Sequence, residues 1–531
     1  MKNICLNWTI SLLTGLFSLF LITTIGFIFH ISINSYYSAF ALLIFMIVLA
    51  KLIIKDNPKN IIKSILAQYI VLFDLLLFFG IICYFIPDFS YDGTTYHQAM
   101  IILLKNGLNP IWNNVSEFAY NQKYVFWSSI EYVDSFLKFF EIIGANIYHS
   151  FDKIELTKII NFILALSAFC YSFYTLRNFE LSKIKCILLA FVLIYNPVCI
   201  CQMLTNYVDG AFYYLFLILL LSCINYTKNI DINKSLYMIC LSSVMLSNTK
   251  LTGLFTAVII AIIFLTFYYS KKLLTTFLIT AILIVISGIN PYFTNIKQGK
   301  NVFYPVIKNS ILKANRDGMI TSYPKGFENK NRFEKLFISI FSVSKNISPL
   351  LKPDEKPELK IPFTIKGDDE FIYPDMRLAG FGYFFSGILL GTLILSIFIR
   401  FKNKKDKKLF FTVLSILILS IIGNHEAWWA RFVPQFWIIP ILITLFYTIN
   451  TNSNKKHFIF TLFISTCIIN SLIINIQNFK NSIINTKDFK EYVNTLPKVI
   501  YIQENYLQEI HTKQTLPVKL KEYGIETIYI K

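Results

Sequence analysis

Thirteen apolar runs, separated by short polar or charged segments, dominate this sequence. A helix that crosses a membrane needs about 20 mostly apolar residues, and a chain inside lipid must satisfy its backbone hydrogen bonds internally. The runs therefore predict an all-α polytopic membrane protein with about 13 transmembrane helices. They lie at residues 9–28, 37–54, 67–87, 157–176, 184–198, 209–225, 235–247, 251–270, 274–291, 380–399, 409–423, 432–449 and 458–477.

Composition supports a membrane protein and excludes several other classes. Of the 531 residues, 55% are hydrophobic and only 15% are charged, whereas an average soluble domain carries about 25% charge. This balance excludes a disordered chain, a nucleic-acid-binding domain and an ordinary cytosolic enzyme. The net charge of +19 is explained by lysines in short loops, where they orient the chain and meet anionic lipid.

The basic residues alternate between loops and predict the orientation of the chain. The short loops between the basic loops, at 29–36, 199–208, 248–250 and 423–431, contain no Lys or Arg other than Lys250 and Arg431. Basic loops face the cytoplasm, so we expect a multi-pass protein of the cytoplasmic (inner) membrane, with the N-terminus inside and the C-terminus outside. The basic loops are 51–63, 177–185, 226–234, 271–272, 400–408 and 455–456.

The same threading predicts two parts. Residues 1–477 form the membrane domain, with long outer loops at 88–156 and 292–379. Residues 478–531 form a small extracytoplasmic α/β tail. Within it we expect a strand at Val499–Ile502, a short helix at Val518–Tyr523 and a second strand at Thr527–Ile530.

Ionisable residues at membrane depth are costly and mark functional sites. Here most of them gather at the predicted outer ends of the runs. The first cluster follows the third run and holds Asp88, Asp92, Tyr96 and His97. Capping of the following helix would explain Asp92 alone, but not its neighbours. The exception is Asp74, in the inner half of the third run, where a polar contact with a neighbouring helix is the simpler explanation.

Two further candidates lie at the outer ends of later runs. Asp209 begins the sixth run, and Lys250 stands between the seventh and the eighth. A helix cap would also explain Asp209, and snorkelling to the interface would explain Lys250. A lysine on the outer face nevertheless opposes the positive-inside bias, which favours phosphate binding.

The last cluster holds His425, Glu426 and Arg431 around a tryptophan pair. The planar guanidinium of Arg431 suits phosphate oxygens. Acids can deprotonate an acceptor hydroxyl or hold a metal, and cations can stabilise a phosphate leaving group. Together the clusters indicate sugar transfer from a lipid-linked phosphate donor.

Several local phrases also support a resemblance to a known family. The chain resembles the GT-C superfamily of integral-membrane glycosyltransferases, and specifically a bacterial branch of it. The phrases that carry the resemblance are Tyr91-Asp92-Gly93-Thr94-Thr95-Tyr96-His97, Tyr207-Val208-Asp209-Gly210, Asn248-Thr249-Lys250-Leu251-Thr252-Gly253, Asn290-Pro291-Tyr292 and Trp428-Trp429-Ala430-Arg431-Phe432-Val433-Pro434.

The resemblance implies a polyprenyl-phosphate-linked sugar as donor and a catalytic acid in the first large outer loop, which maps onto Asp92. We expect Asp209 to assist catalysis, and Asp88, Tyr96 and His97 to support the acceptor side. Lys250, Arg431, His425 and Glu426 are then expected to bind the donor phosphate. The acceptor is a cell-envelope glycan or lipid, and no nucleic acid is involved. No cofactor is certain, and a need for Mg²⁺ or Mn²⁺ is left open.

Two other functions compete with this hypothesis. A glycan polymerase or ligase shares the many spans and long outer loops, but it relies on Arg-rich loops, and Arg is sparse here. A transporter or flippase predicts charges near the middle of the membrane and paired broken helices. Apart from Asp74, the charged residues lie at the ends of the runs.

Overall fold

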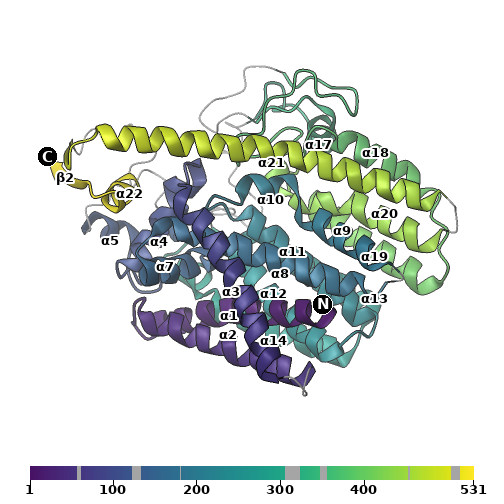
Figure 1. Cartoon of the computed structure of the whole chain (residues 1–531), viewed down its shortest axis with the longest axis horizontal. Helices are drawn as coiled ribbons and strands as arrows, with labels where there is room; N and C mark the ends of the chain where they lie inside the picture. Colours follow the sequence, from purple (N-terminus) through teal and green to yellow (C-terminus); the bar gives the residue numbers. More distant parts are fainter. Residues whose placement is uncertain are drawn as a thin grey trace.

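The computed structural model describes residues 1–56, 61–121, 133–179, 181–304, 323–346, 356–451, 455–503 and 515–530, and these residues are mostly helical (Figure 1). The N-terminal half contains α1 (Lys2–Ile28), α2 (Ser35–Asp56), α3 (Ile61–Phe85), η1 (Gly93–His97), α4 (Gln98–Lys105), α5 (Val115–Asn121), α7 (Phe139–Phe151), η2 (Ile154–Lys158), α8 (Ile159–Leu176), α9 (Lys183–Ile194), α10 (Pro197–Gln202), α11 (Asp209–Thr227) and α12 (Ile232–Thr249).

The remaining elements continue the helical bundle and end in a small sheet. They are α13 (Leu251–Tyr268), α14 (Lys271–Ser287), η3 (Ile289–Phe293), α15 (Thr294–Lys297), α17 (Arg332–Phe341), α18 (Phe385–Ser396), α19 (Lys404–Ile422), η4 (Ala430–Phe432), η5 (Pro434–Trp437), α20 (Ile438–Asn450), α21 (Lys456–Thr495), β1 (Val499–Gln503), α22 (Leu516–Glu522) and β2 (Glu526–Ile530).

Seven helices within the described residues are long and apolar enough to cross a membrane: α1, α2, α3, η2 with α8, α11, α13 and α21. Helix α14 and the segment Ile289–Lys297 pass the same test together, but they are bent by 70° relative to each other, so they form either a broken eighth crossing or a re-entrant loop. The protein is therefore a multi-pass membrane protein by length and composition. The expected number of about 13 crossings is not confirmed, although each predicted run falls on a helix.

The runs that fall short do so for two physical reasons. Helices α9 and α18 have 12 residues each and rise only about 18 Å, less than the roughly 30 Å of a hydrocarbon core. Helix α20, with 13 residues, is also too short. Helix α12 is largely buried among other helices, and a helix that faces protein instead of lipid can carry the polar residues that lower its mean hydropathy.

Helix α11 forms the centre of the bundle, and α2 and α3 form its periphery. In the most apolar stretch of α11, 89% of the residues are buried, whereas the corresponding share for α3 is 6%. Helices α8 and α12 pack directly against α11. The exposed apolar side chains of α2 and α3 are those of a lipid-facing surface. Asp74 is exposed on α3 and lines an apolar groove between α3 and α2.

Helix α21 runs across the predicted boundary between the membrane domain and the tail. It is continuous from Lys456 to Thr495, so the expected break at residues 477–478 falls inside a helix. Its 40 residues extend about 60 Å, twice the thickness of a hydrocarbon core. Figure 1 shows α21 running along one edge of the molecule from α20 to the C-terminal strands.

The chain ends in a strand–helix–strand unit. Strands β1 and β2 pair in parallel, with Val499 opposite Glu526. Helix α22 connects this unit to the bundle through buried charges. The Lys519 ammonium lies 3.0 Å from Glu155 Oε1 and also donates to the Asp88 carbonyl, while Glu522 pairs with Lys153 at 2.6 Å. Glu155 is shared with Lys158, 2.6 Å away. The tail is thereby anchored against the loop that follows α3.

We expect Lys519→Met to lower the free energy of unfolding by about 2–3 kcal/mol, because Glu155 is buried and loses one of its two cations. The measurement is thermal unfolding of the purified protein in detergent. Lys521→Met is the matched control, since Lys521 is exposed on the same helix. Equal stability of the two variants would show that the ion pair between Lys519 and Glu155 does not stabilise the fold.

Candidate functional site

A cavity of about 240 Å³ lies where the predicted clusters meet. Six of the predicted site residues line it, and they come from four separate parts of the chain: Asp92, Tyr96, His97, Asp209, Lys250 and Arg431. Two of them are acids, three are basic residues, and the sixth, Tyr96, contributes an aromatic ring to the wall. The site therefore combines acids, cations and rings in one enclosed space.

Asp92 contacts a cation instead of capping a helix. It precedes η1, but its side chain makes no capping hydrogen bond. Its Oδ2 instead accepts from Arg431 Nη1 at 2.5 Å. Its backbone amide lies 3.4 Å from the hydroxyl of Tyr207, to which it donates. Capping therefore does not explain this acid, and the carboxylate is directed into the cavity.

Asp209 and Lys250 form a second acid–cation pair. Asp209 Oδ1 lies 2.5 Å from Lys250 Nζ, and Asp209 Oδ2 accepts from Gln202 Nε2 at 3.1 Å. Lys250 has extended backbone geometry between α12 and α13, where the two helices meet. This break directs the side chain inward, with the ammonium 4.4 Å from the centre of the Phe432 ring. Lys250 thus pairs with an acid at the cavity wall, and snorkelling does not describe it.

Arg431 connects the pairs into one network. Besides Asp92, it contacts Asp375 Oδ1 through Nε at 3.0 Å and lies 3.8 Å from Asp209 Oδ2. Its side chain is only 11% exposed. Burial by itself would lower the pKa of Arg431, but the carboxylates of Asp375 and Asp92 raise it well above its usual value. The guanidinium therefore stays charged.

Asp375 is the functional candidate that sequence reasoning missed. It lies between α17 and α18, is buried, and accepts from Trp429 Nε1 at 2.7 Å and from Arg377 Nη2 at 3.1 Å. An acid two residues before an arginine is a weak signal by itself. Its importance comes from Arg431, which lies 56 positions further along the chain.

Aromatic rings form much of the remaining wall. Tyr96, Tyr207, Tyr292 and Phe432 line the cavity, and the guanidinium of Arg431 lies 5.0 Å from the centre of the Tyr207 ring. Burial, reinforced by the charge of Asp92, raises the pKa of both Tyr96 and Tyr207. Their hydroxyls therefore remain protonated donors at neutral pH. Flat apolar faces with hydroxyl edges suit an amphipathic ligand such as a sugar ring.

Asp88 has a different place from Asp92. It lines a neighbouring cavity of about 210 Å³, which shares Tyr207 with the first. Its carboxylate accepts from the backbone amides of Ser90 at 2.8 Å and Asn206 at 2.7 Å. Burial raises the pKa of Asp88, although Lys519 opposes the shift. Asp88 thus ties the loop after α3 to the segment before Asp209 and supports the site indirectly.

His97 lines the main cavity and is held from behind. Its Nδ1 lies 2.5 Å from Oε1 of Glu141 on α7, and both side chains are buried. A carboxylate behind a histidine sets the orientation of the ring. Because Nδ1 contacts Glu141, the Nε2 edge of the ring is the part of His97 that is left to face the cavity.

His425 and Glu426 have partners other than the residues of the main cavity. Neither residue is among those that line the main cavity. Glu426 accepts from Tyr323 OH at 2.7 Å and from Trp428 Nε1 at 2.7 Å, beside an aromatic cluster that also contains Trp429. The His425 side chain is 43% exposed and lies 3.2 Å from Glu426. The expected role of both residues in binding the donor phosphate stays a prediction.

Metal binding has no obvious donor set in the described part of the chain. Within it, no three His, Cys, Asp or Glu side chains are grouped as ligands for a metal ion. In the main cavity, Asp92 and Asp209 each face a cation. A carboxylate that faces a cation would have to exchange it for the metal.

No family model, no curated protein and no solved structure matches this chain.

Gly93 allows the loop after α3 to pass close to Asp88. A methyl group at this position would overlap the Asp88 carboxylate and the Ser90 hydroxyl. We expect Gly93→Ala to lower the free energy of unfolding by about 1–3 kcal/mol, measured by thermal unfolding in detergent. The control is Gly391→Ala in α18, where a methyl group meets open space. That change should be neutral or stabilising by about 0.5–1 kcal/mol, and a loss of equal size in both variants would contradict the assignment.

Proposed function

We propose that this protein is a membrane glycosyltransferase of the GT-C type. It transfers a sugar from a polyprenyl-phosphate-linked donor to a cell-envelope glycan or lipid acceptor. The observation that carries the proposal is the convergence of two acid–cation pairs, Asp92 with Arg431 and Asp209 with Lys250, on one cavity with aromatic walls. Acids and cations side by side are what acceptor activation and leaving-group stabilisation require.

Each charged residue has a distinct role in this proposal. The donor phosphate binds to Arg431 and Lys250 and competes with the carboxylates for these cations. Asp92 then accepts the proton of the acceptor hydroxyl as the acceptor oxygen bonds to the anomeric carbon. The bond between that carbon and the phosphate oxygen breaks, and polyprenyl phosphate leaves with both electrons, held by the two cations. Asp209 keeps Lys250 in position, and no step passes through a metal.

The size of the cavity favours transfer of a single sugar. About 240 Å³ lies below the roughly 300–1,000 Å³ of pockets that hold drug-sized ligands. A glycan polymerase or ligase must accommodate oligosaccharides on both sides of the new bond. One sugar ring against the aromatic wall is the better fit.

The ends of the helices support the orientation of the site. Asp209 begins α11, Lys250 separates α12 from α13, and the opposite ends of α11 and α13 lead into the basic segments near Lys228 and Lys271. Basic segments face the cytoplasm. The proposal therefore places the cavity on the outer face of the cytoplasmic membrane, with the N-terminus inside and the C-terminus outside.

Asp92→Asn tests the catalytic role of this acid. In a strain that lacks the chromosomal copy, we expect the variant to reduce the transferred sugar by about 100-fold or more, because the proton acceptor is lost. Mass spectrometry of surface glycans and polyprenyl-linked sugars should show loss of one sugar and accumulation of its lipid-linked donor. Asp152→Asn is the control, since Asp152 is 82% exposed outside the cavity. Full rescue by Asp92→Asn would remove Asp92 as catalyst, and a change in glycan chain length would favour a polymerase.

Arg431→Lys separates geometry from charge. Lysine keeps one positive charge but cannot contact Asp92 and Asp375 through a planar fork. We expect transfer to fall by roughly 100-fold, in the same mass-spectrometric assay. Arg332→Lys is the matched control, because Arg332 is on the exterior and donates to the Ile422 carbonyl. Normal transfer by Arg431→Lys would show that only charge is needed at this position.

A further inference from the structure

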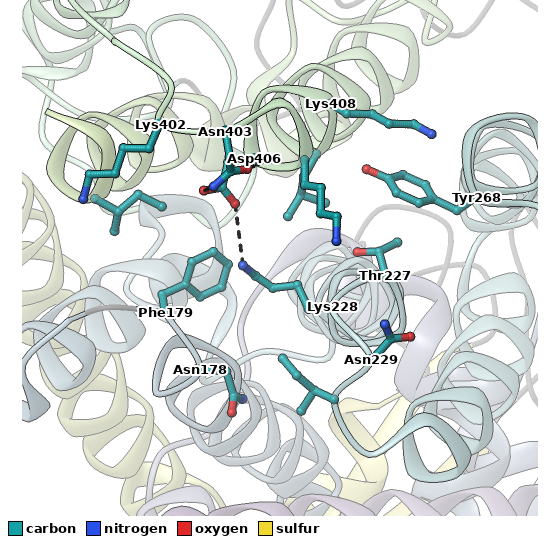
Figure 2. A pocket seen from close by; sticks show the side chains of 14 residues that line it. Asn178, Phe179, Thr227, Lys228, Asn229, Tyr268, Lys402, Asn403, Asp406 and Lys408 are labelled. Atoms are coloured by element: carbon teal, nitrogen blue, oxygen red, sulfur yellow. Dashed lines mark hydrogen bonds and ion pairs between the residues drawn. The ribbon is translucent and has the colours of Figure 1, made fainter.

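A second and larger cavity, of about 780 Å³, lies among the ends of several helices (Figure 2). Its walls come from the segment after α8, the turn between α11 and α12, the end of α13, the start of α19 and the end of α20. Neither acid–cation pair of the candidate active site borders it. The proposed glycosyl transfer therefore gives this cavity no role.

This cavity and the candidate active site lie at opposite ends of the same helices. Asp209, the first residue of α11, lines the active-site cavity, and Thr227, the last residue of α11, lines the second one. Leu251 and Tyr268 have the same relation on α13. Nineteen residues of helix span about 28 Å, close to the hydrocarbon thickness of a bilayer. The second cavity is thus at headgroup depth on the face with the basic loops.

Positive charge dominates the walls of the cavity. Four lysines line it, Lys228, Lys402, Lys405 and Lys408, and they are opposed by one acid, Asp406. Figure 2 shows Lys228 reaching across the cavity toward Asp406, with Nζ 3.7 Å from Oδ1. One carboxylate cannot balance four ammonium groups. A concave surface lined by one sign of charge concentrates ligands of the opposite sign.

Uncharged groups complete a surface that suits an amphiphile. Aromatic rings flank the lysines, with Lys228 Nζ 4.3 Å from the centre of the Phe179 ring and Lys408 Nζ 4.6 Å from that of Tyr268. Apolar side chains of Ile230 and Leu409 lie beside them. A phosphate would meet ammonium groups and amides, while attached apolar groups would meet these side chains.

The cavity is built by specific contacts at the start of α19. The backbone amide of Lys402 donates to Asn450 Oδ1 at 3.1 Å, and Asn403 caps α19 by accepting from the amide of Asp406 at 2.7 Å. The Lys408 ammonium donates to the Phe267 carbonyl at 2.5 Å. These contacts join the α18–α19 connection to α20 and α13. The lysines are therefore presented by a fixed framework.

We infer that this cavity binds a phosphate-bearing anion, and that its basic residues form a binding site separate from the candidate active site. The chemistry is shared by the headgroup of an anionic phospholipid and by a soluble phosphate or diphosphate. Basic pockets between transmembrane helices on the cytoplasmic side are typical sites for acidic headgroups. The inference does not depend on the proposed glycosyl transfer.

The test compares two double variants with the same change of charge. Lys402→Gln with Lys405→Gln removes two lysines that line the cavity, and Lys404→Gln with Lys407→Gln removes two exposed lysines of the same segment that do not line it. The full-length protein is placed in phosphatidylcholine nanodiscs with or without cardiolipin, and retained cardiolipin is counted by native mass spectrometry. Binding of inorganic pyrophosphate is measured by calorimetry in detergent.

We expect the cavity pair to weaken binding by roughly 10- to 30-fold, since each lysine near a phosphate surface contributes about fivefold. The control pair should change it less than twofold. Retention of cardiolipin without binding of pyrophosphate identifies a lipid headgroup as the ligand, and the reverse identifies a soluble anion. An equal loss in both pairs shows diffuse surface charge and overturns the inference, as does a wild-type protein that binds neither probe.

A third variant tests the inference even if the lysine variants fail to fold. Asp406→Asn removes the one acid of the cavity and retains a side-chain oxygen to accept from Asn403, whose Nδ2 lies 2.8 Å from Asp406 Oδ2. We expect it to bind the same probe several-fold more tightly, because the net positive charge rises. Weaker or unchanged binding by this variant would contradict the inference even if the lysine variants proved unstable.

Discussion

The contact between Arg431 and three carboxylates is the constraint on which the candidate site depends. A charge enclosed by protein at the end of a helix bundle costs several kcal/mol unless other charges compensate it. Here Arg431, Lys250 and Arg377 are matched by Asp92, Asp209 and Asp375. Each of these side chains lies within contact distance of an opposite charge, so the segments that carry them must be held in fixed positions. Removing any one member leaves a neighbour uncompensated.

The framework that holds these charges is anchored on both sides. On one side, Asp88 accepts from the amides of Ser90 and Asn206, which brings the loop after α3 against the segment that leads to Asp209. On the other side, Lys519 of α22 reaches Glu155 beneath that loop. The long helix α21 carries this tail from the bundle to the site. A C-terminal element thereby takes part in positioning residues near the start of the chain.

Helices α11 and α13 give the molecule two chemically different ends. One end holds paired acids and cations around a small cavity, and the other holds excess lysine around a larger one. The two cavities lie at opposite ends of these helices, whose length is similar to the thickness of a bilayer core. Paired charges suit chemistry on a bound phosphate, whereas unbalanced positive charge suits recognition of an anion.

The sequence by itself determined that the chain is helical and built for a membrane, because hydropathy is a local property of each run. It also determined that Asp92, Asp209, Lys250 and Arg431 are unusual, because charge at the end of an apolar run is visible without a structure. Only the tertiary structure decided their partners: Asp92 meets Arg431 across 339 positions, and Asp375 joins them from a loop that showed no local signal. It also decided the partners of Glu426, whose carboxylate accepts from Trp428 and Tyr323 and does not line the main cavity. Contacts between distant segments follow from packing, which no local pattern records.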